Sequence, residues 1–286
     1  MNRIRPAGVL PAEPSLNIFE SGRSSLFACA GVLAALNAQA GQIVNDLTFQ
    51  DSLVGLTNLA GVSGIIWFSM YAVLTIGFSD ETARAGASDR VLIGLAVALA
   101  MLPVAAASKI SLELCAVYLL LTSSAGDASR RVGIILLGLT GPLVWGRVLL
   151  EAFAAPLLSL DAYLVGTVIG TPVHGNIVNF ANSSHSFLIG TPCSSLHNVS
   201  MALVLWTTAA ALFRVRFDRR YVGCGLAMAT FMFALNIMRL SLIGLFPQSF
   251  TFLHDGAGSD LFSWAALLGA GLLVFVGIRN AAARQH

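Results

Sequence analysis

Charged side chains are scarce in this sequence: of its 286 residues only 10% are Asp, Glu, Lys or Arg, and Lys109 is the only lysine. Soluble domains usually carry about 25% charged residues, so this chain could not cover a surface exposed to water. The net charge of +2 is too small to indicate a nucleic-acid partner, and no basic patch with interleaved aromatic residues is present. The shortage of charge therefore excludes a soluble globular domain and a nucleic-acid-binding protein.

Apolar residues make up 56% of the chain, and the mean hydropathy is +0.80. A helix needs about 20 apolar residues to cross a membrane, and continuous apolar runs without alternation indicate helices. We therefore predict an all-α fold, a polytopic transmembrane helix bundle of about eight spans. The apolar runs lie at residues 25–44, 53–78, 91–107, 110–123, 132–146, 197–213, 221–245 and 261–278. Pro103 and Lys109 lie where the third and fourth runs meet, so these can be counted as one span or two.

The basic residues orient the bundle, because Lys and Arg are enriched in cytoplasmic loops. With the N-terminus inside, thirteen of the sixteen basic residues are cytoplasmic, and only Lys109, Arg147 and Arg239 lie at or near the outer face. This distribution predicts a multi-pass protein of the cell (inner) membrane with both termini in the cytoplasm. Residues 1–24 hold three prolines and no apolar core, so we expect a cytoplasmic N-terminal arm and not a cleavable signal. Residues 25–286 are predicted to form a single integral-membrane domain.

A long outer segment, residues 147–196, separates the fifth and sixth spans. Its first part, 147–168, mixes charged and apolar residues, which predicts an amphipathic or re-entrant helix at the outer interface. Its second part, GTPVHGNIVNFANSSHSFLIGTPCSS, has turn residues and patches of period two, which predict a short extended or hairpin element. Loops of this length are usually functional.

Cys193 is the cysteine that stands out. Cys29, Cys115 and Cys224 lie inside predicted spans and are interpreted as small buried apolar residues. Cys193 follows Gly-Thr-Pro, opens the sixth span and has no outer cysteine to pair with, so we expect a free thiol. A helix N-terminus lowers a thiol pKa from about 8.5, so Cys193 is a candidate nucleophile.

Two further residues are predicted to reach the same outer face. Arg239 lies near the outer end of the seventh span, where it either serves a functional site or extends to the lipid headgroups. His254 lies in a short outer loop, where it is either a site residue or a solvated surface residue. A thiol, an imidazole and a guanidinium together suit acyl transfer at a peptide bond: nucleophile, proton carrier and oxyanion contact.

The motifs around these residues resemble the exosortase/archaeosortase family of membrane cysteine transpeptidases. The resembling parts are the GTPVHGNIV turn, Cys193-Ser194-Ser195-Leu196, Asn236-Ile237-Met238-Arg239 and His254-Asp255-x-x-Gly258. The resemblance implies about eight spans, with Cys193 as nucleophile, His254 as base and acid, and Arg239 as oxyanion or carboxylate contact. It also implies a substrate class, exported proteins with a C-terminal sorting signal of the PEP-CTERM kind. Such proteins would be cleaved through a thioester and passed to an acceptor or to water.

The sequence departs from the family pattern next to the cysteine, where Ser195 stands in place of the usual Gly and His197 where Arg is common. These changes indicate a divergent member and leave the recognition motif open. His197 lies one helical turn after Cys193 and is either a second candidate base, ranked below His254, or a polar contact in the substrate groove. Ser194, Asp255 and Asn236 are predicted supporting residues, and Asn236 is expected to help orient Arg239.

No cofactor or metal is expected, because His174, His185, Cys193 and His197 match no compact zinc signature. The expected partners are exported protein substrates and membrane lipid; the oligomeric state stays open. Two other classes remain as alternatives. A small transporter could use Arg239 and Glu113 as intramembrane charges, although the paired halves expected of a transporter are not visible. A non-catalytic membrane assembly factor for exopolysaccharide or surface proteins would not need the thiol.

Overall fold

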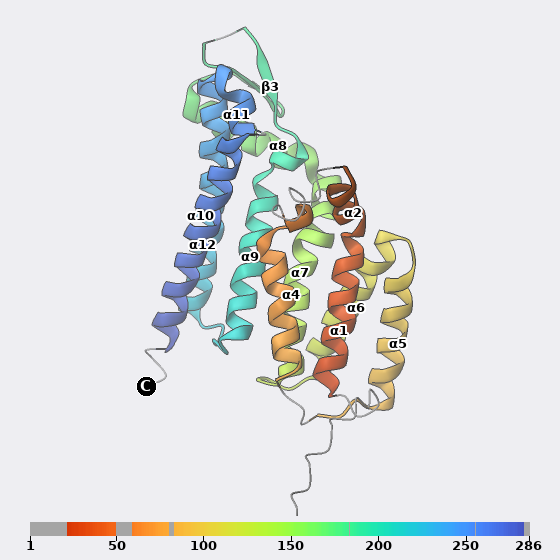
Figure 1. Ribbon diagram of the computed structural model, residues 1–286. Coiled ribbons are helices and arrows are strands. Elements are labelled where there is room, and N and C mark those ends of the chain that lie inside the picture. Colours follow the sequence, from red (N-terminus) through yellow and green to blue (C-terminus); the bar gives the residue numbers. More distant parts are fainter. Residues whose placement is uncertain (1–21, 50–58, 80–82, 183, 255, 283–286) are drawn as a thin grey trace, which may run out of the picture.

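The computed structural model describes residues 22–49, 59–79, 83–182, 184–254 and 256–282. These residues form a bundle of helices with one small sheet at one end (Figure 1). The α-helices are α1 (Arg23–Ala38), α2 (Ala40–Phe49), α4 (Gly64–Gly77), α5 (Ala87–Met101), α6 (Ala105–Thr122), α7 (Ala128–Thr140), α8 (Gly146–Ile169), α9 (Ser195–Leu212), α10 (Arg219–Leu245), α11 (Phe250–His254) and α12 (Ala257–Ala282). The strands are β1 (Val173–His174), β2 (Ile177–Asn179) and β3 (Ser186–Leu188).

Five helical segments in the described part of the chain are long and apolar enough to cross a membrane. A sixth is added if α1 and α2, which are bent by 55° relative to each other, are counted as one span. The fold is therefore all-α, and its helices are those of a multi-pass membrane protein. The helices α4 and α5 have 14 and 15 residues, which is shorter than the usual span of about 20.

The region 91–123 forms two helices, which answers the question that the sequence left open. The helix α5 ends at Met101 and α6 begins at Ala105, with Leu102 extended at φ −69° and ψ 138°. The break falls before Pro103, because a proline disfavours helical backbone in the residue before it. Lys109 therefore lies inside α6, and the predicted division near that residue is wrong by several positions.

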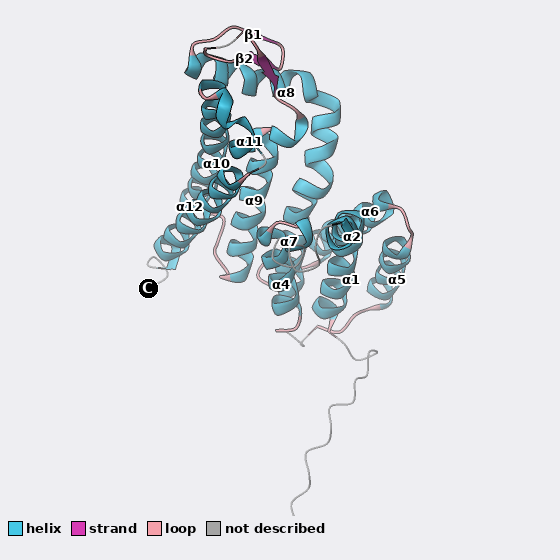
Figure 2. Cartoon of the chain, turned by 45° about the horizontal axis from the view of Figure 1, so that its top comes forward, coloured by secondary structure: helices cyan, strands magenta, loops and turns pink. Residues whose placement is uncertain are grey.

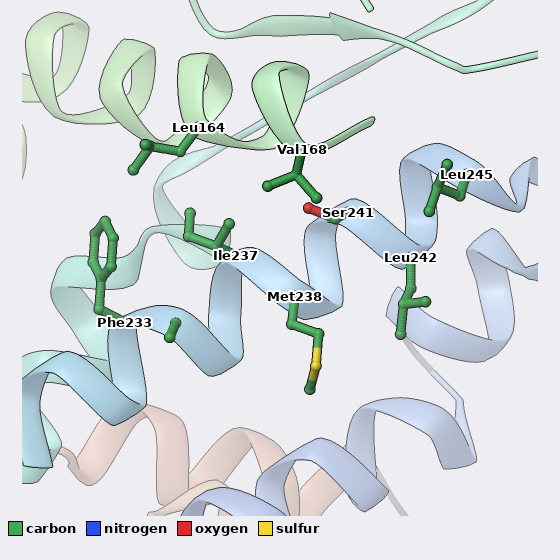
Figure 3. Close-up of a pocket in the computed structure, with 9 residues that line it drawn as sticks. Leu164, Val168, Phe233, Ile237, Met238, Ser241, Leu242 and Leu245 are labelled. Atoms are coloured by element: carbon green, nitrogen blue, oxygen red, sulfur yellow. The ribbon is translucent and has the colours of Figure 1, made fainter. Parts of the chain in front are cut away.

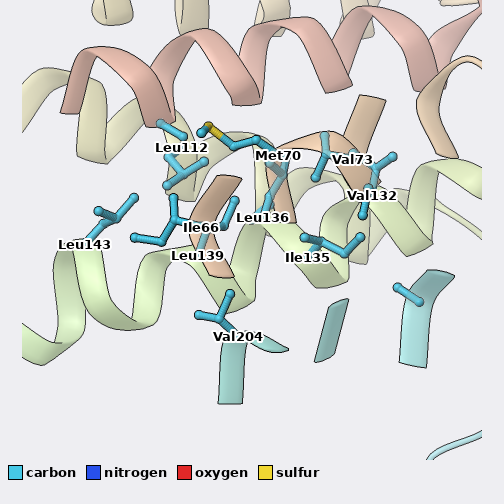
Figure 4. Close-up of a cluster of buried hydrophobic side chains, with 14 of the residues drawn as sticks. Ile66, Met70, Val73, Leu112, Val132, Ile135, Leu136, Leu139, Leu143 and Val204 are labelled. Carbon is cyan, nitrogen blue, oxygen red and sulfur yellow. The ribbon is translucent and has the colours of Figure 1, made fainter. Parts of the chain in front are cut away.

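The main core lies among α1, α4, α5, α6, α7 and α9 (Figure 4). Met70, Leu112, Leu136 and Val204, from four different helices, are at most 3% exposed. Small residues let helices approach closely, as is common in membranes. At Gly77, an added Cβ would overlap that of Ala28 on the neighbouring helix α1.

The helix α8 continues α7 through a π-helical turn, η3 (Gly141–Trp145), and then lies across the end of the bundle over α9 and α10 (Figures 1 and 2). A kink at Phe153, with φ −128° and ψ 27°, precedes Pro156. Proline lacks an N–H and its ring displaces the carbonyl four residues earlier, which bends the helix. The predicted helix over 147–168 is thus present, with bounds 146–169.

The predicted extended element is a three-stranded antiparallel sheet of order β1-β2-β3. Val173 pairs with Val178, and Val178 pairs in turn with Phe187. Gly175, at φ 62°, forms the tight turn between β1 and β2, where the left-handed backbone favours glycine. The sheet covers a second apolar cluster that contains Cys193 together with residues of α8, α10 and α11.

The end of the bundle opposite the sheet holds the start of α1 and the end of α12 (Figure 1). There the Arg23 guanidinium lies 2.9 Å from the Asp89 carboxylate and donates to the Ser123 hydroxyl at 2.9 Å. These contacts tie α1 to α5 and to the end of α6. The predicted arm, residues 1–24, lies outside the described residues up to residue 21, and α1 already begins at Arg23.

Candidate active site

Cys193 ends a single 3-10 turn, η4 (Thr191–Cys193), immediately before α9. Its N–H donates to the Gly190 carbonyl at 3.0 Å, and Ser194 caps α9 by accepting the Leu196 N–H on its hydroxyl at 3.2 Å. The cysteine is 9% exposed. Cys193 therefore lies just before the helix that it was predicted to open. Hydrogen bonds hold the residues before and after it.

His254 is the residue that the fold brings to this thiol. The Sγ of Cys193 lies 3.4 Å from Nε2 of His254, although 61 positions separate them in the sequence. His254 is the last residue of α11, and its imidazole stacks on the Phe250 ring, with centroids 5.0 Å apart and an interplanar angle of 9°. This stacking orients the ring edge, and with it Nε2, toward the sulfur.

Gly258 of the same motif has a packing role. An added Cβ at this position would lie 2.8 Å from both the ring and the carbonyl oxygen of Phe252. The start of α12 therefore rests directly on α11, and only glycine permits this approach. The contact fixes the short helix that carries His254.

Asn236 of α10 holds the backbone around the cysteine. Its Nδ2 donates to the Cys193 carbonyl at 2.9 Å and to the Ser195 hydroxyl at 3.1 Å. Its Oδ1 accepts from Nδ2 of Asn198 at 3.1 Å. The side chain is 3% exposed. These contacts link Asn236 to the turn of Cys193, which differs from its expected role as a support for Arg239.

Asp161 is the residue that reasoning from the sequence missed. Its carboxylate is 3% exposed and accepts the Ser195 N–H at 3.0 Å. The side chains of Ser194 and Ser195 lie beside it. The available signal was an acidic residue within the apolar run AAPLLSLDAYLVG, since an ionisable group in a membrane segment indicates a function by default.

This carboxylate changes the electrostatics predicted for the thiol. The positive end of the α9 dipole faces Asp161, which offers it a negative charge directly. The N–H groups of Ser194, Ser195 and Leu196 donate to the Thr191 carbonyl, Asp161 and the Ser194 hydroxyl respectively. The first N–H groups of α9 therefore already have acceptors in the turn and on α8.

Arg239 lies one helical turn after Asn236 on α10 and is half-buried. Its Nη1 donates to the Ser259 hydroxyl at 3.5 Å. Within the described residues, its buried Nε has no hydrogen-bond partner. With Asn198, Asn236 and Ser263, the arginine lines a small cavity of about 50 Å³ between α9, α10 and α12. The Arg239 guanidinium thus lines a small cavity of mixed polar and apolar side chains, which Asn236 also lines.

An apolar groove of about 440 Å³ runs along the other face of α10, where it meets α8 (Figure 3). Leu164 and Val168 of α8 face Ile237 and Ser241 of α10 across it (Figure 3). In the described part of the chain, the buried Ser241 hydroxyl has no hydrogen-bond partner. The same helix therefore presents Asn236 to the cysteine and an apolar face to the groove.

Other predicted residues lie apart from this geometry. His197 is in the first turn of α9 with an exposed side chain, and His174 and His185 are exposed at the sheet. Asp255 lies outside the described residues. The described residues contain no group of three or more His, Cys, Asp or Glu placed to hold a metal ion.

No known family model, curated protein or solved structure matches this chain.

Proposed function

We propose that this protein is a membrane-embedded cysteine transpeptidase or endopeptidase, and that it cleaves a C-terminal sorting signal of exported proteins. The observation that carries the proposal is the contact of 3.4 Å between Cys193 Sγ and His254 Nε2. A thiol and an imidazole within hydrogen-bond reach, with the imidazole oriented by a third group, are the mark of an activated nucleophile. The Phe250 ring supplies that orientation here.

The reaction follows from these positions. His254 Nε2 takes the thiol proton, and the Cys193 sulfur attacks the carbonyl carbon of the scissile peptide bond. The resulting oxyanion is stabilised by the Arg239 guanidinium, because the N–H groups at the start of α9 already have acceptors. The C–N bond then breaks, the leaving amine takes the proton from His254, and a thioester remains on Cys193. An acceptor amine or water attacks this thioester and releases the thiol.

The proposal includes eight spans, namely α1, α4, α5, α6, α7, α9, α10 and α12, with both termini in the cytoplasm. The described chain begins and ends at one end of the bundle, and the start of α9, which directly follows the Cys193 turn, lies toward the other, which supports an even number of crossings (Figure 1). The active site then faces the periplasmic or extracellular side of the cell membrane. The apolar groove between α8 and α10 is the place where the substrate's own helix would bind.

The test is to express Cys193→Ala and Cys193→Ser with an exported protein that ends in a short motif, a transmembrane helix and basic residues. Loss of processing in both variants, and a thioester adduct on the wild-type Cys193, are the expected results. Cys29→Ser is the matched control, because this free thiol is exposed on α1 away from the site. Normal processing by both Cys193 variants would refute the proposal and favour a transporter or an assembly factor.

A further inference from the structure

The strongest unexplained feature is a buried carboxylate at the start of α9. Asp161 is 3% exposed and comes from α8, 34 positions before the serine whose N–H it accepts. A buried acid is costly unless it is fully hydrogen-bonded. The Ser195 N–H donates to it at 3.0 Å, and the side chains of Ser194 and Ser195 lie beside it. Both serines directly follow Cys193.

A continuous hydrogen-bonded chain runs from this carboxylate to the cysteine. The Ser195 N–H donates to Asp161 at 3.0 Å, and the Ser195 hydroxyl accepts from Nδ2 of Asn236 at 3.1 Å. The same Nδ2 donates to the Cys193 carbonyl at 2.9 Å. Helices α8, α9 and α10 each contribute one residue to these hydrogen bonds, so the hydrogen bonds define how the three helices meet next to the thiol. Polar chains that are fully satisfied make a buried site rigid.

We propose that Asp161 is a positioning residue for the nucleophile. It holds Ser194 and Ser195, and through Asn236 it holds the Cys193 carbonyl, so that the sulfur stays directed at His254. The effect that we expect of Asp161 on turnover rests on the proposed function. Its effect on the position of the Cys193 thiol can be measured without any substrate. A displacement of about 1 Å in a reacting group can reduce a rate by 10²-fold.

The first readout needs no substrate. A membrane-impermeant maleimide is applied to the full-length protein in liposomes, and alkylation of Cys193 is followed by mass spectrometry. We expect Asp161→Ala to be alkylated at least fivefold faster than the wild type, because the turn is released and the sulfur becomes more accessible. Asp161→Asn keeps an oxygen that accepts the Ser195 N–H, and we expect its rate to stay within twofold of the wild type.

The second readout is processing of the exported substrate. For Asp161→Ala we expect kcat to fall at least tenfold with KM within twofold, and for Asp161→Asn a recovery of most of that loss. Asp218→Ala is the control, because Asp218 also accepts an N–H at the start of a helix, that of Tyr221 at 2.7 Å, but as the exposed N-cap of α10 itself. It should lower the melting temperature and leave both readouts within twofold.

Unchanged alkylation in a folded Asp161→Ala, or an equal acceleration in Asp218→Ala, would overturn the inference. Ser195→Ala keeps the test decisive if Asp161→Ala does not fold. It removes the hydroxyl that accepts from Asn236 and keeps the N–H that donates to Asp161, and we expect at least twofold faster alkylation; an unchanged rate counts against the proposal. A wild-type protein that processes no substrate would refute the proposed function, and the alkylation rates would still decide the role of Asp161.

Discussion

Replacing Asn236 with alanine removes three hydrogen bonds at once, two donated to Cys193 and Ser195 and one accepted from Asn198. Hydrogen bonds between helices in membranes contribute about 0.6 kcal/mol on average and at most about 1.7 kcal/mol. The loss of three therefore lowers the free energy of unfolding by about 2 kcal/mol. The larger effect is on chemistry, because the Cys193 carbonyl loses its donor. We expect turnover to fall about 10- to 100-fold.

The chain offers a matched control in Asn37. Its Nδ2 also donates to a backbone carbonyl and a serine hydroxyl, those of Ala100 and Ser108, but it joins α1 to α5 and α6, which hold no residue of the site. Unfolding is measured by denaturant titration in micelles and turnover by substrate processing. We expect Asn37→Ala to lose about 1–2 kcal/mol and to keep turnover within twofold.

The isosteric Asn236→Asp variant sharpens the test. It preserves shape but sets a carboxylate oxygen against the Cys193 carbonyl oxygen, so its turnover should fall below that of Asn236→Ala. Wild-type turnover in Asn236→Ala, at the expected loss of stability, would refute the view that this amide positions the nucleophile. Equal losses of turnover in Asn236→Ala and Asn37→Ala would refute it as well.

Three further predictions concern other parts of the molecule. Gly77→Ala should destabilise the fold by about 1–3 kcal/mol because its Cβ overlaps a side chain of α1. Gly94→Ala, which meets open space on α5, should instead stabilise it by up to about 1 kcal/mol; similar unfolding midpoints would contradict the close packing. His254→Ala should reduce turnover about 10²- to 10⁴-fold, while the exposed His174 can be replaced by Ala with less than a twofold change. Arg239→Ala should reduce kcat about 10²- to 10³-fold, and Arg239→Lys, which keeps the charge, should recover part of it; equal kcat in the two variants would argue against charge stabilisation.

Most of the helices could be predicted from apolar runs alone. The runs at 197–213, 221–245 and 261–278 match α9, α10 and α12 closely, because the cost of exposing backbone to lipid acts on each segment separately. The boundary predicted near Lys109 was wrong, because apolar residues on both sides of a helix end do not show where the helix ends. Pro103 does show it, because a proline disfavours helical backbone in the residue before it. The bend at Phe153 depends on Pro156 in the same local way.

The candidate site was predictable only in part. Charge asymmetry and span order were enough to assign Cys193 and His254 to one face, and the structure places them within 3.4 Å. Their catalytic roles remain predictions. The carboxylate of Asp161 at the start of α9 was not predicted, because it comes from α8. A contact between residues 34 positions apart leaves no trace in the periodicity of either segment.

The sequence by itself determined that this chain is a bundle of helices, several of them long and apolar enough to cross a membrane, because low charge and long apolar runs are local properties that add along the chain. It also determined which few polar residues could carry chemistry there, since charged and thiol groups are so scarce. Only the tertiary structure decided how they meet. The distance from Sγ to Nε2 depends on how α11 rests on α12, and the order of the cysteine turn depends on the carboxylate of α8 and the amide of α10. These contacts arise from packing between helices, where positions distant in the sequence become neighbours.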